Sequence, residues 1–415
     1  MTDICYPKSE PLLSVEEALQ TIQDAIHPLN RTISVKLSDA LGRILTQNII
    51  SPIDSPPERN AAMDGYAFSS LDIIENQPFS LTAVGTSWAG KPYTGPIKNQ
   101  QCVRIFTGAV VPNFADSVIA QEQVSRTDEL VTLPDNTQAF KNIRAPGSDV
   151  RQHDLLLSAP KQLTACDLGL LASVGISQVQ VSSPLKIGFF STGDELTAID
   201  QVLQPGQIYD SNRYLLAGLL NSPNHIATDL GVIKDHPAHL EQTLQNAALE
   251  FDVLISTGGA SVGDKDFVKQ TLEKCGQVNF WKLAIKPGKP LAFGQIGDCW
   301  FFGLPGNPIA VLVTYEQFVK PALLQLAGVQ PTRPLKLRAR CETALHKSPG
   351  RQEYQRGIFK QSASGEFSVT TAGKQDSHQL KTASLANCFI VLDKDCGGVE
   401  TGAMVIIEPF NTRIE

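Results

Sequence analysis

The sequence predicts a multidomain α/β plus β protein, with a central three-layer α/β domain whose sheet is rich in parallel strands. Three observations predict this class. The chain has 415 residues, more than one hydrophobic core serves, so several domains are expected. Between residues 183 and 330, short apolar runs alternate with amphipathic helical patterns, which indicates a mostly parallel sheet covered by helices. Elsewhere, short Val, Ile and Thr runs separated by Gly, Pro and Asn are typical of β structure.

The first part of the chain predicts a helical base interrupted by a β-rich lobe. Residues 14–27 have the pattern of an amphipathic helix, and Ser14 lies three residues before Glu17, which is the capping-box spacing. A second helical pattern follows within residues 142–182 and could pack beside the first. We therefore expect a helical base from residues 10–50 and 142–182, with residues 51–141 inserted as a β-rich lobe.

The rest of the chain predicts two further domains. Residues 183–330 are expected to form the central α/β domain, in which "KIGFF", "ATDLGVI", "DVLIS" and "WFFGL" are strands, and residues 308–328 form one long helix. Beyond residue 331 the helical patterns stop. The short strands of residues 331–415, separated by Gly and Pro, predict a C-terminal β-barrel.

Composition excludes several classes of function. The net charge of −7 provides no general attraction to nucleic acid or to anionic membranes, so neither is expected as a partner. The eight cysteines include no C-x-x-C pair, which disfavours a zinc site and suits reduced thiols in a cytoplasmic protein. No apolar run approaches the roughly 18 residues of a membrane span, and the N-terminus lacks the apolar core of a signal peptide.

Three glycine-containing loops are expected at one edge of the central sheet. They are "STGDEL" (191–196), "STGGASVGDKD" (256–266) and "GLPGNP" (303–308), and each follows a predicted strand. Ligands of open α/β sheets bind beyond the carboxyl ends of the strands, where glycine lets backbone N–H groups approach an oxyanion. The expected cofactor-binding residues of these loops are Gly258, Gly259, Ser261, Gly263, Pro305, Gly306 and Asn307.

Carboxylates beside these loops predict a divalent cation. Asp194, Glu195, Asp264 and Asp266 would repel a bare phosphate, but they suit Mg²⁺ bridging the protein and a phosphate. No loop matches the P-loop pattern, which disfavours that class of nucleotide triphosphatase.

A lysine cluster supplies the positive charge that an anionic ligand needs. Lys282, Lys286 and Lys289 occur within "FWKLAIKPGKPLAFG" (280–294). In an extended segment Lys282 and Lys286 lie on the same face, because their spacing is even. The alternative is a solvated edge strand whose lysines prevent aggregation.

The motifs together resemble one known family. "NAAMDGYA" (60–67) precedes "STGDEL", "GGASVGDKD", "KLAIKPGKP" and "GLPGNP", in this order. That set is similar to the molybdopterin molybdenumtransferases, the MoeA family, and to the E domain of gephyrin. The resemblance covers nearly the whole chain and implies the same four segments that the patterns predict.

The resemblance implies a function in molybdenum cofactor biosynthesis. It implies a Mg²⁺-dependent reaction in which molybdenum from molybdate enters adenylylated molybdopterin and AMP leaves. It also implies a homodimer whose clefts are lined by both subunits, with a molybdopterin adenylyltransferase as the upstream partner. We expect no covalent protein nucleophile, because the pterin sulfurs attack the metal.

The resemblance also implies site residues by matching positions. Asp64 would reach the partner's cleft, although its carboxylate could instead stabilise a turn or cap a helix. Asp235 could equally be the N-cap of the helix that begins at Pro237. The matching catalytic positions are Asp64, Glu195, Asp235, Asp266, Lys282 and Lys286, of which Glu195, Asp235 and Asp266 are the expected metal ligands. Further matching positions that bind the substrate are Thr107, Asp149, Arg356 and Ser377.

The sequence departs from the family pattern at several positions. Ser148 stands where the family usually has an acid, "PPERN" replaces the usual stretch before "AAMDGYA", and "RQHDLLLSAP" lacks a common glycine. Two other classes of function stay open at this point. One is an adenylyltransferase that consumes ATP, and the other is a non-catalytic scaffold of the gephyrin type.

Overall fold

A computed structural model describes residues 12–234, 237–258, 267–330 and 333–410 of the chain. The chain divides into two compact units. The first unit comprises Met1–Ile33, Gly42–Thr46 and Val181–Glu415, and the second comprises Ser34–Leu41 and Gln47–Gln180. No helix among the described residues is long and apolar enough to cross a membrane.

The first unit is built on a six-stranded sheet with the strand order β18-β15-β19-β23-β22-β20. The first four strands in this order are parallel, and β22 and β20 complete the sheet in antiparallel pairings. The strands are β15 (Leu185–Thr192), β18 (His225–Ile233), β19 (Val253–Thr257), β20 (Gln277–Lys282), β22 (Pro290–Ile296) and β23 (Cys299–Leu304). The predicted parallel-rich sheet is therefore confirmed.

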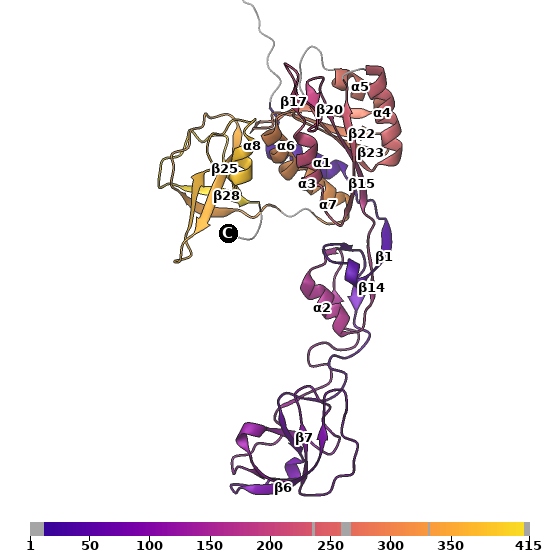
Figure 1. The fold of residues 1–415 in the computed structure, drawn as a ribbon, viewed down its shortest axis with the longest axis vertical. Helices are drawn as coiled ribbons and strands as arrows, with labels where there is room; N and C mark the ends of the chain where they lie inside the picture. The colour runs from indigo at the N-terminus through magenta and orange to yellow at the C-terminus, as the bar shows by residue number, and fades with distance from the viewer. Residues whose placement is uncertain (1–11, 235–236, 259–266, 331–332, 411–415) are drawn as a thin grey trace, which may run out of the picture. The chain divides into compact units, whose positions relative to one another are not determined.

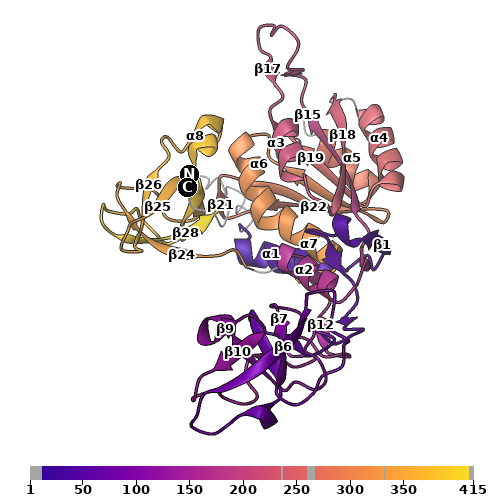
Figure 2. The ribbon, with the colours of Figure 1, turned by 60° about the horizontal axis from the view of Figure 1, so that its bottom comes forward.

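Helices cover both faces of this sheet, which makes three layers (Figures 1 and 2). Alternation along the strands separates the faces, because successive side chains of a strand point to opposite sides. Val253 and Ile255 join a core with α1, α3, α6 and α7, whereas Leu254 joins a second core with α4 and α5. The helices are α1 (Val15–Ala25), α3 (Asn212–Leu219), α4 (Pro237–Glu250), α5 (Phe267–Cys275), α6 (Pro308–Thr314) and α7 (Lys320–Leu326).

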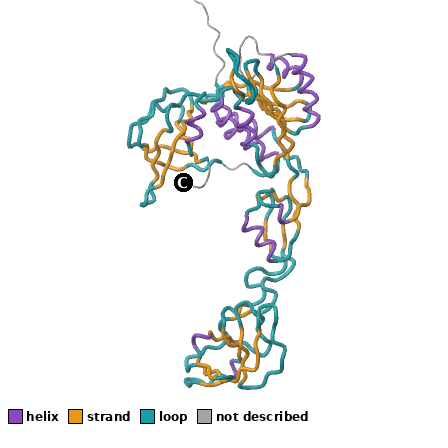
Figure 3. The backbone as a smooth tube through the Cα atoms, in the orientation of Figure 1, coloured by secondary structure: helices purple, strands orange, loops and turns teal. Residues whose placement is uncertain are grey.

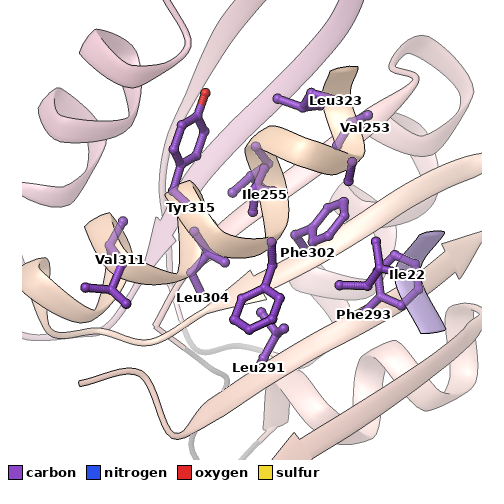
Figure 4. Close-up of a cluster of buried hydrophobic side chains, with 14 of the residues drawn as sticks. Ile22, Val253, Ile255, Leu291, Phe293, Phe302, Leu304, Val311, Tyr315 and Leu323 are labelled. Carbon is purple, nitrogen blue, oxygen red and sulfur yellow. The ribbon is translucent and has the colours of Figure 1, made fainter. Parts of the chain in front are cut away.

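The first of these cores is the larger of the two. Figure 4 shows Phe293, Phe302 and Leu304 of the sheet beside Tyr315 and Leu323 of the covering helices. Burying a side chain of this size stabilises a fold by roughly 1.5–3 kcal/mol. The core therefore holds the strand ends, and the loops that follow them, in a defined arrangement.

Helix α1 belongs to this α/β layer. Its predicted capping box is confirmed, since the Ser14 side chain accepts from the Glu17 backbone and the Glu17 side chain accepts from the Ser14 backbone. Ile22 and Ile26 are fully buried in the core that α1 shares with α7. The helix of residues 142–182, α2 (Ala165–Ser173), belongs to the second unit. The two helices predicted to form a base thus lie in different units, because α1 buries its apolar face on the α/β domain.

The long helix expected over residues 308–328 has a different local structure. Five residues between α6 and α7, Tyr315–Val319, form a π-helix. Pro321 lacks an N–H group and cannot donate to the carbonyl four residues earlier, so the wider π register accommodates the break.

A closed β-barrel ends the first unit, as predicted. Strands β25, β26, β24, β28 and β27 pair in this order, and β25 also pairs with β27, which closes a ring of five strands. The short strand β21 (Ile285–Lys286) pairs with β25 and links the lysine segment to the barrel. The other elements are β24 (Leu337–Cys341), β25 (Gln352–Gln361), β26 (Phe367–Thr371), α8 (Leu380–Leu385), β27 (Cys388–Leu392) and β28 (Met404–Pro409).

The second unit is rich in β structure, and Figure 3 shows few helical segments in it. Its largest sheet has the order β8-β5-β7-β6-β10-β9, in which only β6 and β7 are parallel. These strands are β5 (Gly65–Phe68), β6 (Phe79–Ser87), β7 (Gln101–Ile105), β8 (Ser117–Ala120), β9 (Ser125–Thr127) and β10 (Leu130–Leu133). Helix α2 packs on β12 of the same unit and has its own capping box, made by Thr164 and Asp167.

The remaining strands of the chain are short. Strands β16 and β17 form a two-stranded parallel ladder that leaves the carboxyl end of β15. The short strands are β1 (Thr32–Lys36), β2 (Ile44–Leu45), β3 (Ile49–Ile50), β4 (Asn60–Ala61), β11 (Ile143–Arg144), β12 (Leu155–Leu157), β13 (Lys161–Gln162), β14 (Gln178–Ser182), β16 (Leu196–Thr197) and β17 (Ile208–Tyr209).

Candidate functional site

Three loops meet at the carboxyl ends of the parallel strands. A Cβ atom added to Gly258, directly after β19, would lie 2.6 Å from the carbonyl oxygen of Thr192 at the end of β15. A Cβ atom on Gly306, after β23, would lie 3.8 Å from the Cα of Gly258. Gly258 also has a φ of 83°, a conformation that glycine adopts without strain. The backbone at this edge is thus closely packed, and a side chain at Gly258 would disturb it.

A pocket of about 420 Å³ lies beside these loops, within the roughly 300–1,000 Å³ typical of small-molecule sites. Three segments from distant parts of the first unit form it: the strand-end loops, the lysine segment and the barrel. Its lining residues are Gly258, Lys286, Pro287, Gly288, Lys289, Pro290, Pro305, Gly306, Asn307, Ala310, Arg351, Gln375 and Ser377.

The pocket is positively charged. Lys286, Lys289 and Arg351 line it, and no carboxylate occurs among its described lining residues. Arg351 is partly buried and has no ion-pair partner in the described part of the chain. The amino-terminal end of α6, which contributes Ala310, adds the partial positive charge of a helix. In a chain with a net charge of −7, this concentration of cations indicates an anionic ligand.

The barrel holds Lys286 in place. The Lys286 ammonium lies 3.0 Å from a carboxylate oxygen of Glu353, its direct neighbour in the β21–β25 pairing. The Lys286 side chain is 47% exposed, whereas that of Glu353 is 7% exposed and also accepts from the Gln355 side chain at 3.1 Å. Glu353 therefore orients the lysine from behind and leaves part of its ammonium group open to a ligand.

Arg356, which was expected to bind the substrate, lies behind the pocket and is fully buried. Its guanidinium donates to the carbonyls of Lys374, Gln375 and Asp376 at 2.9–3.1 Å and to the Thr382 hydroxyl at 3.1 Å. Burial lowers the pKa of Arg356 to about 10, so the group is still charged at neutral pH. Arg356 thus fixes the loop that brings Gln375 and Ser377 to the pocket.

A network of buried polar side chains connects the carboxyl ends of β15 and β19 and contacts the loop after β23. The buried Ser191 hydroxyl lies 2.8 Å from the Thr257 hydroxyl and donates to Asp210 at 3.0 Å, and Asp210 forms an ion pair with Arg213 at 2.8 Å. The Asn212 side chain donates to the carbonyl of Gly306 at 2.8 Å. Sequence analysis did not select these residues as site residues.

The acids expected to hold Mg²⁺ are only partly described. Glu195 follows β15, is exposed, and its carboxylate accepts no hydrogen bond from the described residues. Both of its oxygens lie within 2.8 Å of where a Cβ atom on Gly193 would stand, so the carboxylate folds back over the strand end. Such an unpaired, exposed carboxylate fits a ligand of Mg²⁺. Asp235 and Asp266 lie outside the described residues, as do Gly259, Ser261 and Gly263.

The second unit carries three of the expected residues. A carboxylate oxygen of Asp64 accepts from the Thr107 backbone at 2.8 Å and from the Thr107 hydroxyl at 2.7 Å. These two hydrogen bonds lower the pKa of Asp64 below its ordinary value, and the bond from the Thr107 backbone has the larger effect. Asp149 is exposed, and its backbone donates to the Ser55 carbonyl at 3.1 Å. Asp64 and Thr107 thus form one cluster, and no hydrogen bond or ion pair among the described residues connects Asp149 to it.

Sequence analysis found part of this pocket and missed part of it. The pocket brings together seven of the residues that sequence analysis singled out: Gly258, Lys286, Lys289, Pro305, Gly306, Asn307 and Ser377. Lys282, at the end of β20, is not among its lining residues. Arg351 and Gln375 were missed. A basic residue directly after the Pro-Gly turn that precedes β25 was the available signal for Arg351.

The fold and the pocket together define an α/β protein with a cationic pocket at the carboxyl ends of its parallel strands. Comparison with known families gives this class a name. Residues 13–175 match the family described as MoeA N-terminal region (domain I and II). Residues 188–325 match a probable molybdopterin binding domain, and residues 338–410 match the MoeA C-terminal region (domain IV).

Individual proteins agree with these matches. A molybdopterin molybdenumtransferase of Haemophilus influenzae is 42% identical over 96% of this chain and 99% of its own length. Gephyrin of Dictyostelium discoideum is 32% identical over 96% of this chain and 62% of its own length. The crystal structure of a molybdopterin biosynthesis MoeA protein of Pyrococcus horikoshii has a TM-score of 0.83, with 26% identity over 96% of this chain and all of the other. The chain belongs to the MoeA family of molybdopterin molybdenumtransferases, the transferases of molybdenum cofactor biosynthesis.

Proposed function

We propose that this chain transfers molybdenum from molybdate to adenylylated molybdopterin and releases AMP, and that the cationic pocket of the first unit holds the anionic groups. One observation carries the proposal. The pocket combines three cations, exposed glycine backbone at strand ends and two polar barrel side chains, and no carboxylate lines it among the described residues.

The charges of the substrates match this lining. Molybdate is a tetrahedral dianion, and adenylylated molybdopterin carries a pyrophosphate, so both require several donors at short range. Hydrogen bonds between ionised partners are roughly twice as strong as neutral ones. Lys289 and Arg351 are the cations without a described ion-pair partner, and a guanidinium can hold two oxygens of one anion.

Lys286 has a more restricted role in this proposal. Its ion pair with Glu353 neutralises part of its charge but directs the remaining donors of the ammonium group toward the pocket. Gln375 and Ser377, on the loop that Arg356 fixes, supply neutral donors on the opposite side. The pocket thereby positions the reacting groups, which is the main contribution that an enzyme makes to phosphoryl and related transfers.

The protein supplies positioning and charge, and we propose no covalent bond between substrate and side chain. The dithiolate sulfurs of the pterin replace oxygen ligands of molybdate, which leave as water. A water molecule cleaves the phosphoanhydride into AMP and the phosphate ester of the pterin. Glu195, together with Asp235 and Asp266, is proposed to hold Mg²⁺. When bound, this ion neutralises charge at the phosphoanhydride.

We further propose a homodimer in which both subunits line each cleft. Asp64, Thr107 and Asp149 are then contributions of the second unit to a partner's cleft. Lys282, which belongs to the lysine segment, is proposed to act in the same cleft. A molybdopterin adenylyltransferase is the proposed upstream partner, because it makes the adenylylated substrate, and both are expected in the cytoplasm.

The test is a reconstituted reaction. Purified protein is mixed with adenylylated molybdopterin, molybdate and Mg²⁺, and both AMP and active cofactor are measured. The proposal predicts AMP release that requires molybdate. Turnover of ATP without molybdate would instead indicate an adenylyltransferase, and the absence of any product would indicate a non-catalytic scaffold.

Two matched variants test the pocket itself. Lys286→Met is expected to lower AMP release by about tenfold or more, since one ionic hydrogen bond is lost. Lys320→Met is the control, because Lys320 is 50% exposed and also pairs with a carboxylate, Glu316, but does not line the pocket. Equal activities of the two variants would exclude the pocket as the reaction site.

A further inference from the structure

An aromatic stack stands on the surface of the second unit. The rings of Trp88 and Phe106 are parallel, with centroids 4.2 Å apart and an interplanar angle of 9°. The guanidinium of Arg104 lies 4.9 Å from the centroid of the Phe106 ring and 5.0 Å from that of Tyr66. The series therefore runs from Trp88 through Phe106 and Arg104 to Tyr66, and Trp88, at its end, is 51% exposed.

The backbone holds this stack in one geometry. Strands β6 and β7 are parallel, and Phe106 continues the ladder by donating its N–H to the Ser87 carbonyl at 3.3 Å. Trp88 and Lys91 bond to each other through both backbone groups at 2.9–3.0 Å, which forms a tight turn. Tyr66 and Arg104 are direct neighbours on β5 and β7. The indole is thus fixed by the sheet before any ligand arrives.

The unit does not need this indole for its own core. Two apolar clusters of the unit contain Tyr66 and Ile105, respectively, and neither of them contains Trp88 or Phe106. An exposed tryptophan is unfavourable in water, and aromatic residues at such positions are enriched at binding surfaces. A rigid aromatic face also loses little conformational entropy when a ligand stacks on it.

Hydrogen-bonding groups adjoin the stack. Thr107 follows Phe106 directly, and both of its donors bind the same oxygen of Asp64. The other carboxylate oxygen of Asp64 accepts no hydrogen bond from the described residues. The hydrogen bonds from the Thr107 backbone and hydroxyl, and to a smaller extent the charge of Arg104, lower the pKa of Asp64, so this acceptor is ionised at neutral pH. An acceptor of N–H groups thus lies at Thr107, the residue that follows Phe106 of the stack.

We propose that Trp88, Phe106 and Arg104 form a stacking platform for the pterin ring of the substrate, with Asp64 as an acceptor for its N–H edge. This inference rests on the proposed function, which supplies two flat heterocycles, a pterin and an adenine. The pterin presents two neighbouring donors, its 2-amino group and the adjacent ring N–H. The adenine amino group stands between ring nitrogens that are acceptors, and a carboxylate repels these. The carboxylate therefore favours the pterin.

The experiment uses tryptophan fluorescence of the full chain. Of the three tryptophans, Trp300 is 8% exposed and Trp281 is packed against the core of the first unit, so Trp88 is the one open to a ligand. The free probes are 2-amino-4-oxopteridine, AMP and ribose 5-phosphate. We expect the pteridine to quench the fluorescence. The Trp88→Leu variant is expected to bind it about 5- to 150-fold more weakly, which corresponds to the roughly 1–3 kcal/mol of ring stacking.

Controls separate the platform from other effects. Phe140→Leu is the matched variant, because Phe140 is an exposed aromatic residue of the same unit outside the stack, and its pteridine affinity should equal that of the wild type. Since Trp88→Leu removes the reporter, its affinity is measured by calorimetry. Arg104→Lys keeps the charge but loses the planar group, and should weaken binding less than Trp88→Leu.

Each outcome decides between the hypotheses. Stronger binding of AMP than of the pteridine would overturn the pterin assignment. Unchanged pteridine affinity in Trp88→Leu, or no pteridine binding to the wild type at millimolar concentrations, would overturn the platform. The proposed function has its own readout: if the wild type binds the pteridine but releases no AMP with molybdate, the function fails while the platform stands. In the working enzyme, Trp88→Leu should raise KM for adenylylated molybdopterin and leave kcat unchanged.

Discussion

Replacing Arg356 tests whether this residue binds a ligand or positions a loop. In the structure its guanidinium is fully buried and donates four hydrogen bonds, three of them to consecutive carbonyls of residues 374–376. Arg356→Met keeps most of the side-chain volume but removes all four bonds. A positioning role predicts a mobile loop, and therefore weaker binding in the pocket that Gln375 and Ser377 line.

The magnitude follows from the number and the surroundings of these bonds. A hydrogen bond to a charged group contributes about 1.5–3 kcal/mol, but acceptors on an exposed loop regain water when the donor is lost. The apolar side chain also avoids the cost of burying a charge. We therefore expect a net local loss of about 2–4 kcal/mol, which is less than the sum of four full bonds.

Amide hydrogen exchange of residues 373–379 measures this loss directly. A decrease of about 2–4 kcal/mol in the free energy of local opening accelerates exchange roughly 30- to 1,000-fold. Molybdate affinity, measured by calorimetry, should fall in the same variant. Arg356→Lys should lie between the wild type and Arg356→Met, because an ammonium group cannot reproduce the planar fork. Weaker molybdate binding with unchanged loop exchange would refute this reasoning and would support direct contact between Arg356 and the ligand.

Three further predictions address other parts of the molecule. Gly258→Ala should lower AMP release, because the new Cβ atom would lie 2.6 Å from the Thr192 carbonyl oxygen. The backbone φ of 83° would also cost about 1–2 kcal/mol in alanine. Normal activity with an unchanged circular dichroism spectrum would contradict the packing of the strand ends. Thr107→Val removes one of the two donors that lower the pKa of Asp64. These hydrogen bonds stabilise the folded state above the unfolded carboxyl pKa of about 3.9, and this stabilisation is lost as pH falls through the lower pKa of the folded state. The variant should therefore move the titration of Asp64 to higher pH, which NMR can follow. Burial lowers the pKa of His225, so the folded state binds this proton less readily than the unfolded state does, and stability should fall as pH decreases below about 6.5. His225→Gln should reduce that fall in the thermal midpoint between pH 7 and pH 5, and an identical pH profile would show that another group causes it.

Local patterns in the sequence predicted the local elements well. The capping box of Ser14 and Glu17 and the start of α4 at Pro237 depend on residues within one or two turns of each other. The strands of the central sheet follow from short apolar runs, and parallel pairing follows from their alternation with helices. The positive φ of Gly258 is also a local property of its turn, although the close packing of this glycine against the Thr192 carbonyl involves a distant strand.

The pocket itself required contacts between distant residues. Lys286 and Glu353 are 67 positions apart, and they meet because β21 pairs with β25. Arg351 and Arg356 lie five positions apart in similar sequence surroundings, yet one lines the pocket and the other is buried behind it. The π-helix at Tyr315–Val319 interrupts a segment whose apolar pattern predicted one continuous helix.

The sequence alone determined the class of fold, and it predicted the edge of the sheet where the cationic pocket lies and the residue types that line it. Tertiary structure decided which of the basic side chains face the pocket and which support it. The physical reason is that helix caps, strand periodicity and glycine turns depend on interactions between near neighbours. The exposure of an arginine depends instead on which distant backbone carbonyls the closed barrel brings within hydrogen-bonding distance.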